Sequence, residues 1–336
     1  MARVRLIDVA ERAQVSMKTV SNVVNGYAHV QPQMRARVQA AIDELGYRPN
    51  LTARRLATGR TGMIALAMPE IDHPYFGEMA SHLAEIALQR GYRVIIEQTL
   101  SDPEAEKAVL QDREAGLVDG VIFQPTRMAT LDIARLHDDL PLVLLGEVDA
   151  PVTTDHVMID NIAAARDGVS HLISLGRSRV AFLGLVEGDI TITNRRRLLG
   201  YQEALVGGDI PPDPQLVLTT HGFDAHDAES AVDDALARGV DLDAILCRDD
   251  RFAAGALTAL RRSGLRVPDD VAVMGWDDSA ITEYTSPTLT SIAPNKLELA
   301  ERAFDLLHQR IHGHHGPGRH LIVPHGISVR ESAPGA

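Results

Sequence analysis

The stretch RLIDVAERAQVSMKTVSNVVNG, residues 5–26, decides how the start of this 336-residue chain folds. Its apolar residues recur at helical spacing in two short runs, Leu6 to Ala13 and Met17 to Val24. Ser16 lies between the runs, and Ser is a frequent N-cap residue, so we expect the second helix to begin there. The pattern predicts two short helices joined by a tight turn, an arrangement found in many DNA-binding proteins.

A third helix is predicted after a short loop, and the three helices form one basic segment. The third run opens at Gln31-Pro32 and closes at Gly46, and its apolar residues at helical spacing are Met34, Val38, Ala41, Ile42 and Leu45. Residues 1–61 hold ten Lys or Arg and four Asp or Glu, which gives +6, whereas the other 23 basic and 42 acidic residues give −19. The total charge of −13 therefore conceals a basic segment of the kind that binds nucleic acid.

The second helix carries the side chains that we expect to contact DNA. Hydroxyl groups and a helix N-terminus suit phosphate oxygens, while the donors and acceptors of Lys18 and Asn22 suit base edges. The candidate DNA-binding residues in and after this helix are Ser16, Met17, Lys18, Thr19, Ser21, Asn22, Asn25 and His29. A three-helix bundle with a solvated polar face would show the same periodicity, but the charge of +6 and the tight turn favour DNA.

Residues 50–61 are predicted to form a hinge helix or a linker. The possible helix from Leu51 to Thr58 follows Pro49 and ends before Gly59, and about eight residues are too few for a helix that is stable alone. Leu56 beside several arginines is typical of a side chain that wedges into the minor groove. A plain linker would be richer in Gly, Ser or Pro.

From Gly62 onward, buried strands alternate with amphipathic helices. The continuous apolar runs predicted as strands are Met63 to Met68, Tyr92 to Ile96, Gly120 to Phe123, Leu142 to Leu145, Val180 to Leu185, Leu216 to Leu218, Ala244 to Cys247 and Val271 to Met274. This alternation is typical of βαβ units and hence of parallel sheets covered on both faces. About nine strands in two blocks, divided near Asp160-Asn161, favour two doubly wound lobes over one sheet.

Polar side chains recur directly after these strands, where ligands of open α/β sheets bind. The strand ends read Pro69-Glu70, Gln98, Gln124-Pro125, Gly146-Glu147, Glu187, Thr220, Asp249-Asp250 and Trp276-Asp277-Asp278. Carboxylates that accept from hydroxyls, beside a flat ring, suit a carbohydrate, whereas a phosphate would need a Gly-rich loop that opens a helix. One of the arginines 195–197 could complement these acids, and some of the acids only cap the following helices.

The N-terminal segment resembles that of the lactose-repressor and galactose-repressor (LacI/GalR) family of transcriptional regulators. The residues that carry the resemblance are Val9-Ala10, Val15-Ser16, Thr19 to Gly26, Gly46 to Asn50, Ala53 and Leu56-Ala57. The resemblance implies a homodimer that reads a pseudo-palindromic operator in double-stranded DNA, with Leu56 inserted at a base step and Ala53 in the minor groove. Asn22 stands where many members have Arg, and Asn favours adenine where Arg favours guanine.

The resemblance extends over the rest of the chain and implies its domain organisation. It implies a helix-turn-helix domain over residues 1–49, the hinge, and an effector-binding core over residues 62–336 that is similar to periplasmic sugar-binding proteins. Two lobes of this core would be joined by three chain crossings. The N-lobe is expected at about 62–161 and 293–321, and the C-lobe at about 162–292 and 322–336.

Strand ends and resemblance together give the candidate effector-binding residues. They are Tyr75, Phe76, Glu147, Arg195, Phe223, Asp249, Trp276 and Asp277. The resemblance implies that Arg195, the first Arg of the family's motif, holds a sugar hydroxyl. Gly146 and the segment Pro294-Asn295-Lys296 depart from the family pattern, so a lactose-like galactoside is not the expected sugar.

The predicted function is a repressor controlled by a small effector, and a sugar is the expected one. A sugar-binding protein without DNA activity is opposed by the basic N-terminal segment. A sugar-modifying enzyme would need a base or nucleophile motif, and none is present, so neither catalysis nor a cofactor is expected. Within the regulator class, a purine corepressor is the alternative to a sugar, and Asp249 and Arg195 favour the sugar.

Several negative observations complete the prediction. A single Cys247 excludes an internal disulfide, no stretch approaches ~18 apolar residues, and the polar start contains no secretory signal, so a cytoplasmic protein is expected. The histidines from His308 to His325 flank a Gly/Pro-rich stretch, which favours a solvated loop over a metal site. No heptad repeat precedes Ala336, which predicts a dimer and no coiled-coil tetramer.

Overall fold

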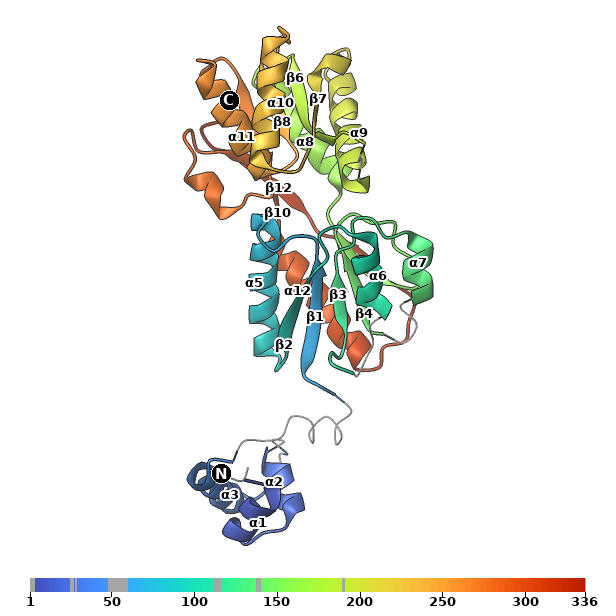
Figure 1. Cartoon of the computed structure of the whole chain (residues 1–336), viewed down its shortest axis with the longest axis vertical. Helices are drawn as coiled ribbons and strands as arrows, with labels where there is room; N and C mark the ends of the chain where they lie inside the picture. The colour runs from blue at the N-terminus through green and yellow to red at the C-terminus, as the bar shows by residue number, and fades with distance from the viewer. Residues whose placement is uncertain are drawn as a thin grey trace. The chain divides into compact units, whose positions relative to one another are not determined.

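Two units make up the chain in the computed structural model, Met1–Thr61 and Gly62–Ala336, which we call the head and the core (Figure 1). The structure describes residues 4–24, 27, 29–47, 60–111, 116–136, 140–188 and 191–335. The predicted hinge helix and the candidates Asn25, Ala53 and Leu56 lie outside these residues.

The head contains three helices around a small apolar centre. They are α1 (Leu6–Ala13), α2 (Met17–Val24) and α3 (Pro32–Leu45). Gln14 adopts a left-handed conformation with φ 51° that ends α1, and the Val15 N–H donates to the Ala10 carbonyl at 3.0 Å. This is a tight helix end. The buried apolar residues are Val9, Ala10, Ala13, Val20, Val23, Val38, Ala41 and Tyr47. The predicted helix-turn-helix is confirmed.

The N-lobe of the core is a parallel sheet with helices on both faces. Its strand order is β11-β5-β4-β3-β1-β2. The strands are β1 (Met63–Met68), β2 (Arg93–Gln98), β3 (Val121–Phe123), β4 (Leu142–Leu145), β5 (Asp155–Met158) and β11 (His320–Ile322). Helices α5 (Pro74–Gln89) and α12 (Lys296–Ile311) cover one face, and α6 (Pro103–Gln111) and α7 (Thr130–Leu136) cover the other. Both faces of β1 are therefore buried, which explains its unbroken apolar run.

The C-lobe repeats this plan with the strand order β12-β10-β9-β8-β6-β7. The strands are β6 (Val180–Val186), β7 (Val217–Thr220), β8 (Ala244–Cys247), β9 (Ala272–Trp276), β10 (Thr290–Pro294) and β12 (His325–Ser328). Only the β10–β12 pair is antiparallel among the described strand pairs. Helices α8 (Asn161–Ser174) and α9 (Ile192–Gly207) lie on one face, with α10 (Ala225–Ala237) and α11 (Asp250–Arg262) on the other. Two short 3-10 helices are η1 (Pro214–Leu216) and η2 (Ala280–Glu283).

The two-sheet α/β core was predicted correctly, but the strand count was too low. The described residues hold twelve strands rather than about nine. The strands that the apolar runs did not predict are β5, β10, β11 and β12. Their sequences, DHVM, TSIAP, HLI and HGIS, are too short or too polar to stand out as apolar runs. In the part of the chain that the structure describes, no helix is both long and apolar enough to span a membrane.

Candidate functional site

The exposed side of α2 carries the predicted DNA contacts of the head. The Ser16 hydroxyl accepts the Thr19 N–H at 3.1 Å and so caps the helix, as expected. Val20 and Val23 are buried in the head, which turns the start of the helix outward and leaves Met17 51% exposed. The described candidates that are exposed or partly exposed are Ser16, Met17, Lys18, Thr19, Ser21, Asn22 and His29.

A cavity lies between the two lobes of the core, at the carboxyl ends of strands from both sheets. Among the strand-end residues singled out from the sequence, those that follow β1, β3, β4, β8 and β9 and line the cavity are Pro69, Glu70, Gln124, Pro125, Gly146, Glu147, Asp249 and Asp277. Gln98 and Thr220, which end β2 and β7, and Glu187, which follows β6, do not line it. Strand ends of both sheets therefore meet at this cavity, and the structure shows which of their polar residues line it.

Most of the predicted effector residues line this cavity, and one does not. The lining residues among the eight candidates are Tyr75, Phe76, Glu147, Phe223, Asp249, Trp276 and Asp277. The structure does not bring Arg195 to the cavity: its side chain is exposed, and Arg197 lines the wall instead.

The packing of α9 explains this correction. Gly200 lies so close to α8 that a Cβ there would meet the Ile162 carbonyl oxygen at 2.1 Å, and the hydroxyl of buried Tyr201 donates to the Val180 carbonyl at 2.9 Å. These contacts fix the rotation of the helix about its axis. Residues three or four apart share a helix face, so Arg197 lies on the same side as Gly200 and Tyr201, whereas Arg195 is turned away.

Arg197 is a fixed, charged donor in the cavity wall. Its guanidinium carbon lies 3.7 Å from the centroid of the Trp276 ring, a cation–π distance. Its Nε donates to Asn161 Oδ1 at 2.8 Å, and its Nη1 donates to the Arg248 carbonyl. Burial lowers the pKa of Arg197 to about 10, so the group still carries its charge at neutral pH.

Asp249 lines the cavity but is occupied by contacts within the protein. Its Oδ1 accepts the Phe252 N–H at 2.8 Å and caps α11, while Oδ2 lies 3.4 Å from His73 Nε2 and 3.2 Å from Arg248 Nε. Burial raises the pKa of Asp249, but the His73 contact and the Arg248 charge outweigh it and hold the pKa well below its usual value. Asp249 is thus an ionised helix cap that also joins the lobes through His73.

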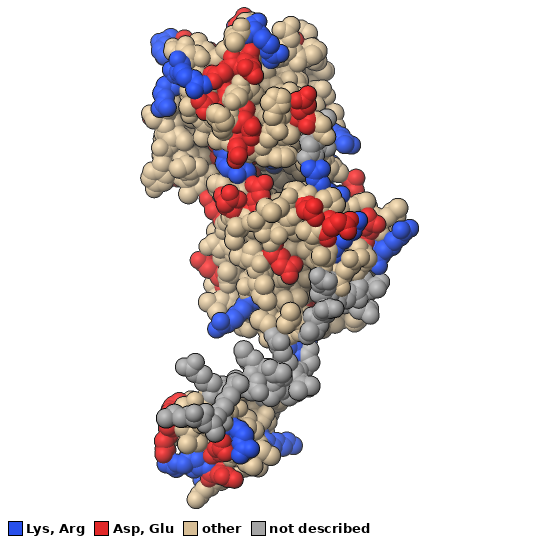
Figure 2. All heavy atoms as spheres, viewed as in Figure 1, with Lys and Arg blue, Asp and Glu red and all other residues tan. Residues whose placement is uncertain are grey.

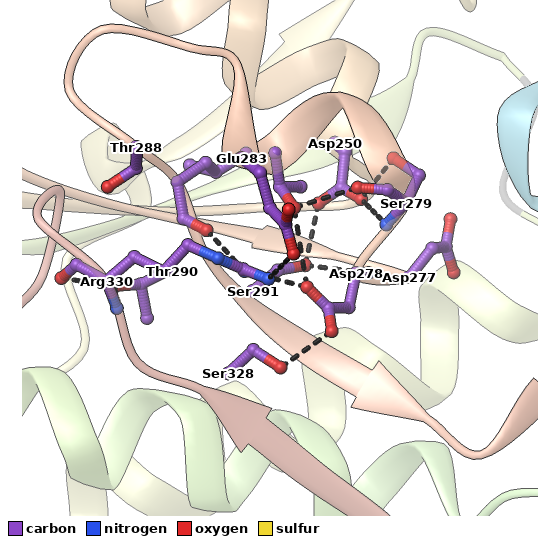
Figure 3. A network of polar contacts seen from close by, with 12 residues as sticks. Asp250, Asp277, Asp278, Ser279, Glu283, Thr288, Thr290, Ser291, Ser328 and Arg330 are labelled. Carbon is purple, nitrogen blue, oxygen red and sulfur yellow. Dashed lines mark hydrogen bonds and ion pairs between the residues drawn. The ribbon is translucent and has the colours of Figure 1, made fainter.

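Asp277 is the acid that remains available to a ligand. Among the described residues its carboxylate accepts no hydrogen bond, and Figure 3 shows it turned away from the polar network that holds its neighbour Asp278. Burial raises the pKa of Asp277, and the charge of Arg197 opposes that rise. Asp277 and Arg197 therefore offer an acceptor and a donor to the same cavity.

Several buried donors lining the cavity also lack a partner among the described residues. These atoms are Asn194 Nδ2, Arg248 Nη1, Arg251 Nε and Trp276 Nε1. Because a buried unpaired donor is costly, such groups mark places where a polar ligand is favourable. Sequence reasoning missed Asn194, Arg248 and Arg251; only Arg248 carried a signal, since it directly follows β8.

Ion pairs join the lobes around the cavity. Arg251 of the C-lobe contacts Glu70 of the N-lobe at 3.1 Å, and Arg196 pairs with Glu147 and, at 2.9 Å, with Asp149. Figure 2 shows acidic and basic side chains together along the junction of the lobes. Glu147 also accepts from Asn161 Nδ2 at 2.6 Å, so both of its carboxylate oxygens are engaged by the protein.

Comparison with known proteins identifies the family to which this architecture belongs. Residues 5–50 match the family described as bacterial regulatory proteins, lacI family, and residues 169–333 match the periplasmic binding protein-like domain. The transcriptional regulator CelR of Thermobifida fusca is 34% identical over 345 residues, covering 96% of each chain. The chain belongs to the LacI family. It is a DNA-binding transcriptional regulator, and its relatives are regulators rather than enzymes.

Solved structures of this family agree over nearly the whole chain. The lac repressor dimer bound to operator and the anti-inducer ONPF has a TM-score of 0.87 at 28% identity and covers 99% of this LacI-family chain and 100% of its own. A CelR–cellobiose complex has a TM-score of 0.72 at 30% identity, with 98% and 100% covered. Within the described residues, no cluster of His, Cys, Asp and Glu is arranged to hold a metal ion.

Proposed function

We propose that this regulator is a homodimeric repressor whose affinity for a pseudo-palindromic operator is set by a sugar bound between its lobes. The observation that carries the proposal is the cavity in which Asp277 and Arg197 face a common space beside Trp276. The CelR–cellobiose complex and the operator-bound lac repressor dimer support it by similarity. A cytoplasmic location belongs to the proposal, since the operator lies there.

The cavity chemistry favours a neutral polyhydroxy ligand. Asp277 accepts from hydroxyls, Arg197 and Asn194 donate to them, and Phe223 and Tyr75 supply apolar surface for C–H groups. The other two C-lobe arginines that line the cavity, Arg248 and Arg251, are already paired with Asp249 and Glu70, so their charges are compensated. A ligand with several hydroxyls and no charge fits this balance better than an anion does.

On the DNA side, the proposal assigns phosphate contacts to Ser16, Thr19 and Ser21 and base contacts to Met17, Lys18 and Asn22. Asn25 and His29 extend this surface. Ala53 and Leu56 enter by resemblance alone, as minor-groove contacts of the hinge. If one arrangement of the lobes favours operator binding, sugar must shift that equilibrium, and operator must weaken sugar binding by the same factor.

A sugar panel tests the effector site, with cellobiose and glucose among its members. We expect one sugar to raise the Tm of the protein, because a ligand that binds the folded state stabilises it. Arg197→Ala should weaken binding of that sugar at least about tenfold, in line with a lost charge-assisted hydrogen bond. Arg195→Ala, two residues away on the same helix, is the matched control and should leave the affinity unchanged. Equal losses in both variants would contradict the assignment.

Titration calorimetry tests the coupling between sugar and DNA. The sugar is titrated into the free protein and into the protein bound to an operator found by binding-site selection. We expect a lower affinity in the presence of operator if the sugar is an inducer. The same affinity in both titrations would reject effector control of DNA binding, even if the sugar binds.

A further inference from the structure

The loop that carries Asp277 has an uncommon backbone. Asp277 and Asp278 follow β9 with φ values of 96° and 47°, so two consecutive residues other than Gly lie in the left-handed region. Such conformations are costly and persist only where the surroundings impose them. The contacts of this loop, residues 277–279, impose its conformation and so decide where the Asp277 carboxylate points.

Every backbone N–H of the loop has an acceptor outside it. The Asp277 N–H donates to the Ile292 carbonyl at 2.9 Å, the Asp278 N–H to Ser291 Oγ at 3.0 Å, and the Ser279 N–H to Asp250 Oδ2 at 2.7 Å. Two of these three acceptors are therefore side chains rather than neighbouring strand carbonyls, and the conformation of the loop depends on them.

Asp250 is the centre of this arrangement (Figure 3). Its carboxylate accepts the N–H and the hydroxyl of Ser279, both at 2.7 Å, and the hydroxyl of Ser291, also at 2.7 Å. Asp250 is 3% exposed and does not line the cavity. A Cβ on Gly275 would lie 2.3 Å from its Oδ1, so the strand before the loop leaves room for this carboxylate.

A second set of contacts holds the loop from the opposite side. The Asp278 carboxylate accepts from Arg330 Nη1 at 2.7 Å and from the Ser328 hydroxyl at 2.6 Å. Lys296, at the start of α12, donates to the carbonyls of Asp277 and Asp278 at 2.6 and 2.9 Å. Asp278 is thus drawn away from the cavity, which leaves Asp277 facing it.

We propose that Asp250 is a positioning residue for effector binding: through Ser279 and Ser291 it holds the strained loop in the conformation that points Asp277 into the cavity. The proposal rests on the proposed role of Asp277 in sugar binding. Asp250 touches no ligand, and its effect on affinity passes entirely through Asp277. This predicts that Asp250 and Asp277 behave as one unit in binding.

Amide hydrogen exchange in the full-length protein tests the positioning without any ligand. Asp250→Ala should speed exchange of the Asp278 and Ser279 amides about tenfold or more. The Ser279 amide loses its acceptor, and the Asp278 amide keeps Ser291 as acceptor but Ser291 is no longer held by Asp250. Asp250→Asn retains an oxygen acceptor and should restore most of the protection. Asp243→Ala is the matched control. Asp243 lies just before β8, whereas Asp250 lies just after it, and the Asp243 carboxylate also accepts two backbone N–H groups, those of Ser178 and Arg179, at 2.9 Å each. It should leave exchange in the loop unchanged.

A double-mutant cycle tests the link to binding, with the panel sugar that most raises the Tm of the unaltered protein as the probe. Asp250→Ala alone should raise Kd about tenfold, but in the Asp277→Asn background it should change Kd less than about twofold. The same factor in both backgrounds would show a merely structural role and overturn the proposal. Ser291→Ala, which removes one link, serves the same cycle if Asp250→Ala does not fold.

The exchange experiment and the double-mutant cycle together distinguish failure of this proposal from failure of the proposed function. If no sugar of the panel binds, the proposed function fails, and the exchange experiment still decides whether Asp250 holds the loop. Unchanged exchange in Asp250→Ala overturns the positioning role whatever the ligand.

Discussion

At the scale of single residues, Asp250 also gives the core a pH dependence. Burial and the charge of Asp277 raise the pKa of Asp250 from 3.8 to about 7. Because the folded-state pKa lies above the unfolded value, the stabilisation from this group is complete below about pH 4 and is lost as the pH rises to about 7. Asp277 and Glu147, whose pKa values burial also raises, contribute with the same sign.

Urea unfolding at pH 5 and pH 8 measures this contribution. The unaltered core should lose stability between the two values, and Asp250→Asn, which mimics the protonated acid, should remove up to about 3 kcal/mol of that loss. An identical pH dependence in the variant would show that Asp250 does not titrate in this range.

Lys18 is the residue on which the proposed base reading depends most directly. It is exposed at the start of α2, next to the Ser16 cap. Lys18→Ala should cost about 1–3 kcal/mol at its cognate base pair and relax sequence preference there. Selection of binding sites from a random library measures both effects, and Arg12→Ala, on the surface of α1 and paired with Glu44, is the control. Retention of the original preference would remove Lys18 from the set of base-reading residues.

At the scale of helices and strands, sequence patterns were informative where one signal was strong. Long apolar runs correctly predicted the central strands, and apolar periodicity correctly predicted the three helices of the head. The rotation of α9 about its axis could not be predicted from the sequence. It is fixed by the contact of Gly200 with α8, and the sequence alone does not show where α8 lies. The support of the Asp277 loop was equally hidden, since Asp250, Ser291 and Arg330 come from distant segments.

The edge strand β11 depends on a buried ion-pair cluster at β5. The Asp155 carboxylate is fully buried and accepts from Arg310 of α12 and Arg319, which precedes β11, at 2.8–3.1 Å. Asp155→Ala would remove the carboxylate that balances the charge of both guanidinium groups and should lower the unfolding free energy by about 3–5 kcal/mol, measured in urea. Asp241→Ala, which breaks an exposed pair with Arg179, should cost less than about 1 kcal/mol. Similar losses in the two variants would mean that the cluster does not hold the sheet edge.

At the scale of the whole molecule, the proposed homodimer needs an apolar surface, and β2 offers one. This edge strand exposes Ile95 and Ile96 by 37% and 41%, and nearby Leu88 and Leu100 are 69% and 66% exposed. An exposed apolar edge strand is unfavourable unless a partner covers it. We therefore place the partner subunit of the proposed dimer on this edge.

Ile96→Glu should convert the dimer to monomers and weaken operator binding by more than about tenfold, because a monomer contacts one half-site. Light scattering after size exclusion measures the mass, and a gel shift measures the DNA affinity. Leu131→Glu is the control, since Leu131 is 67% exposed on α7, which packs on the sheet face away from α5 and α12. A dimer that persists in Ile96→Glu would move the interface elsewhere.

Trp276 is the only tryptophan of the chain, and it lies in the cavity wall beneath Arg197. Fluorescence excited at wavelengths above about 295 nm, where tyrosine hardly absorbs, therefore comes from this one indole, without any label. Ligand entry, lobe movement and displacement of Arg197 all change the surroundings of that ring. The unmodified protein is thus its own optical reporter, and stopped-flow emission can follow effector binding in real time.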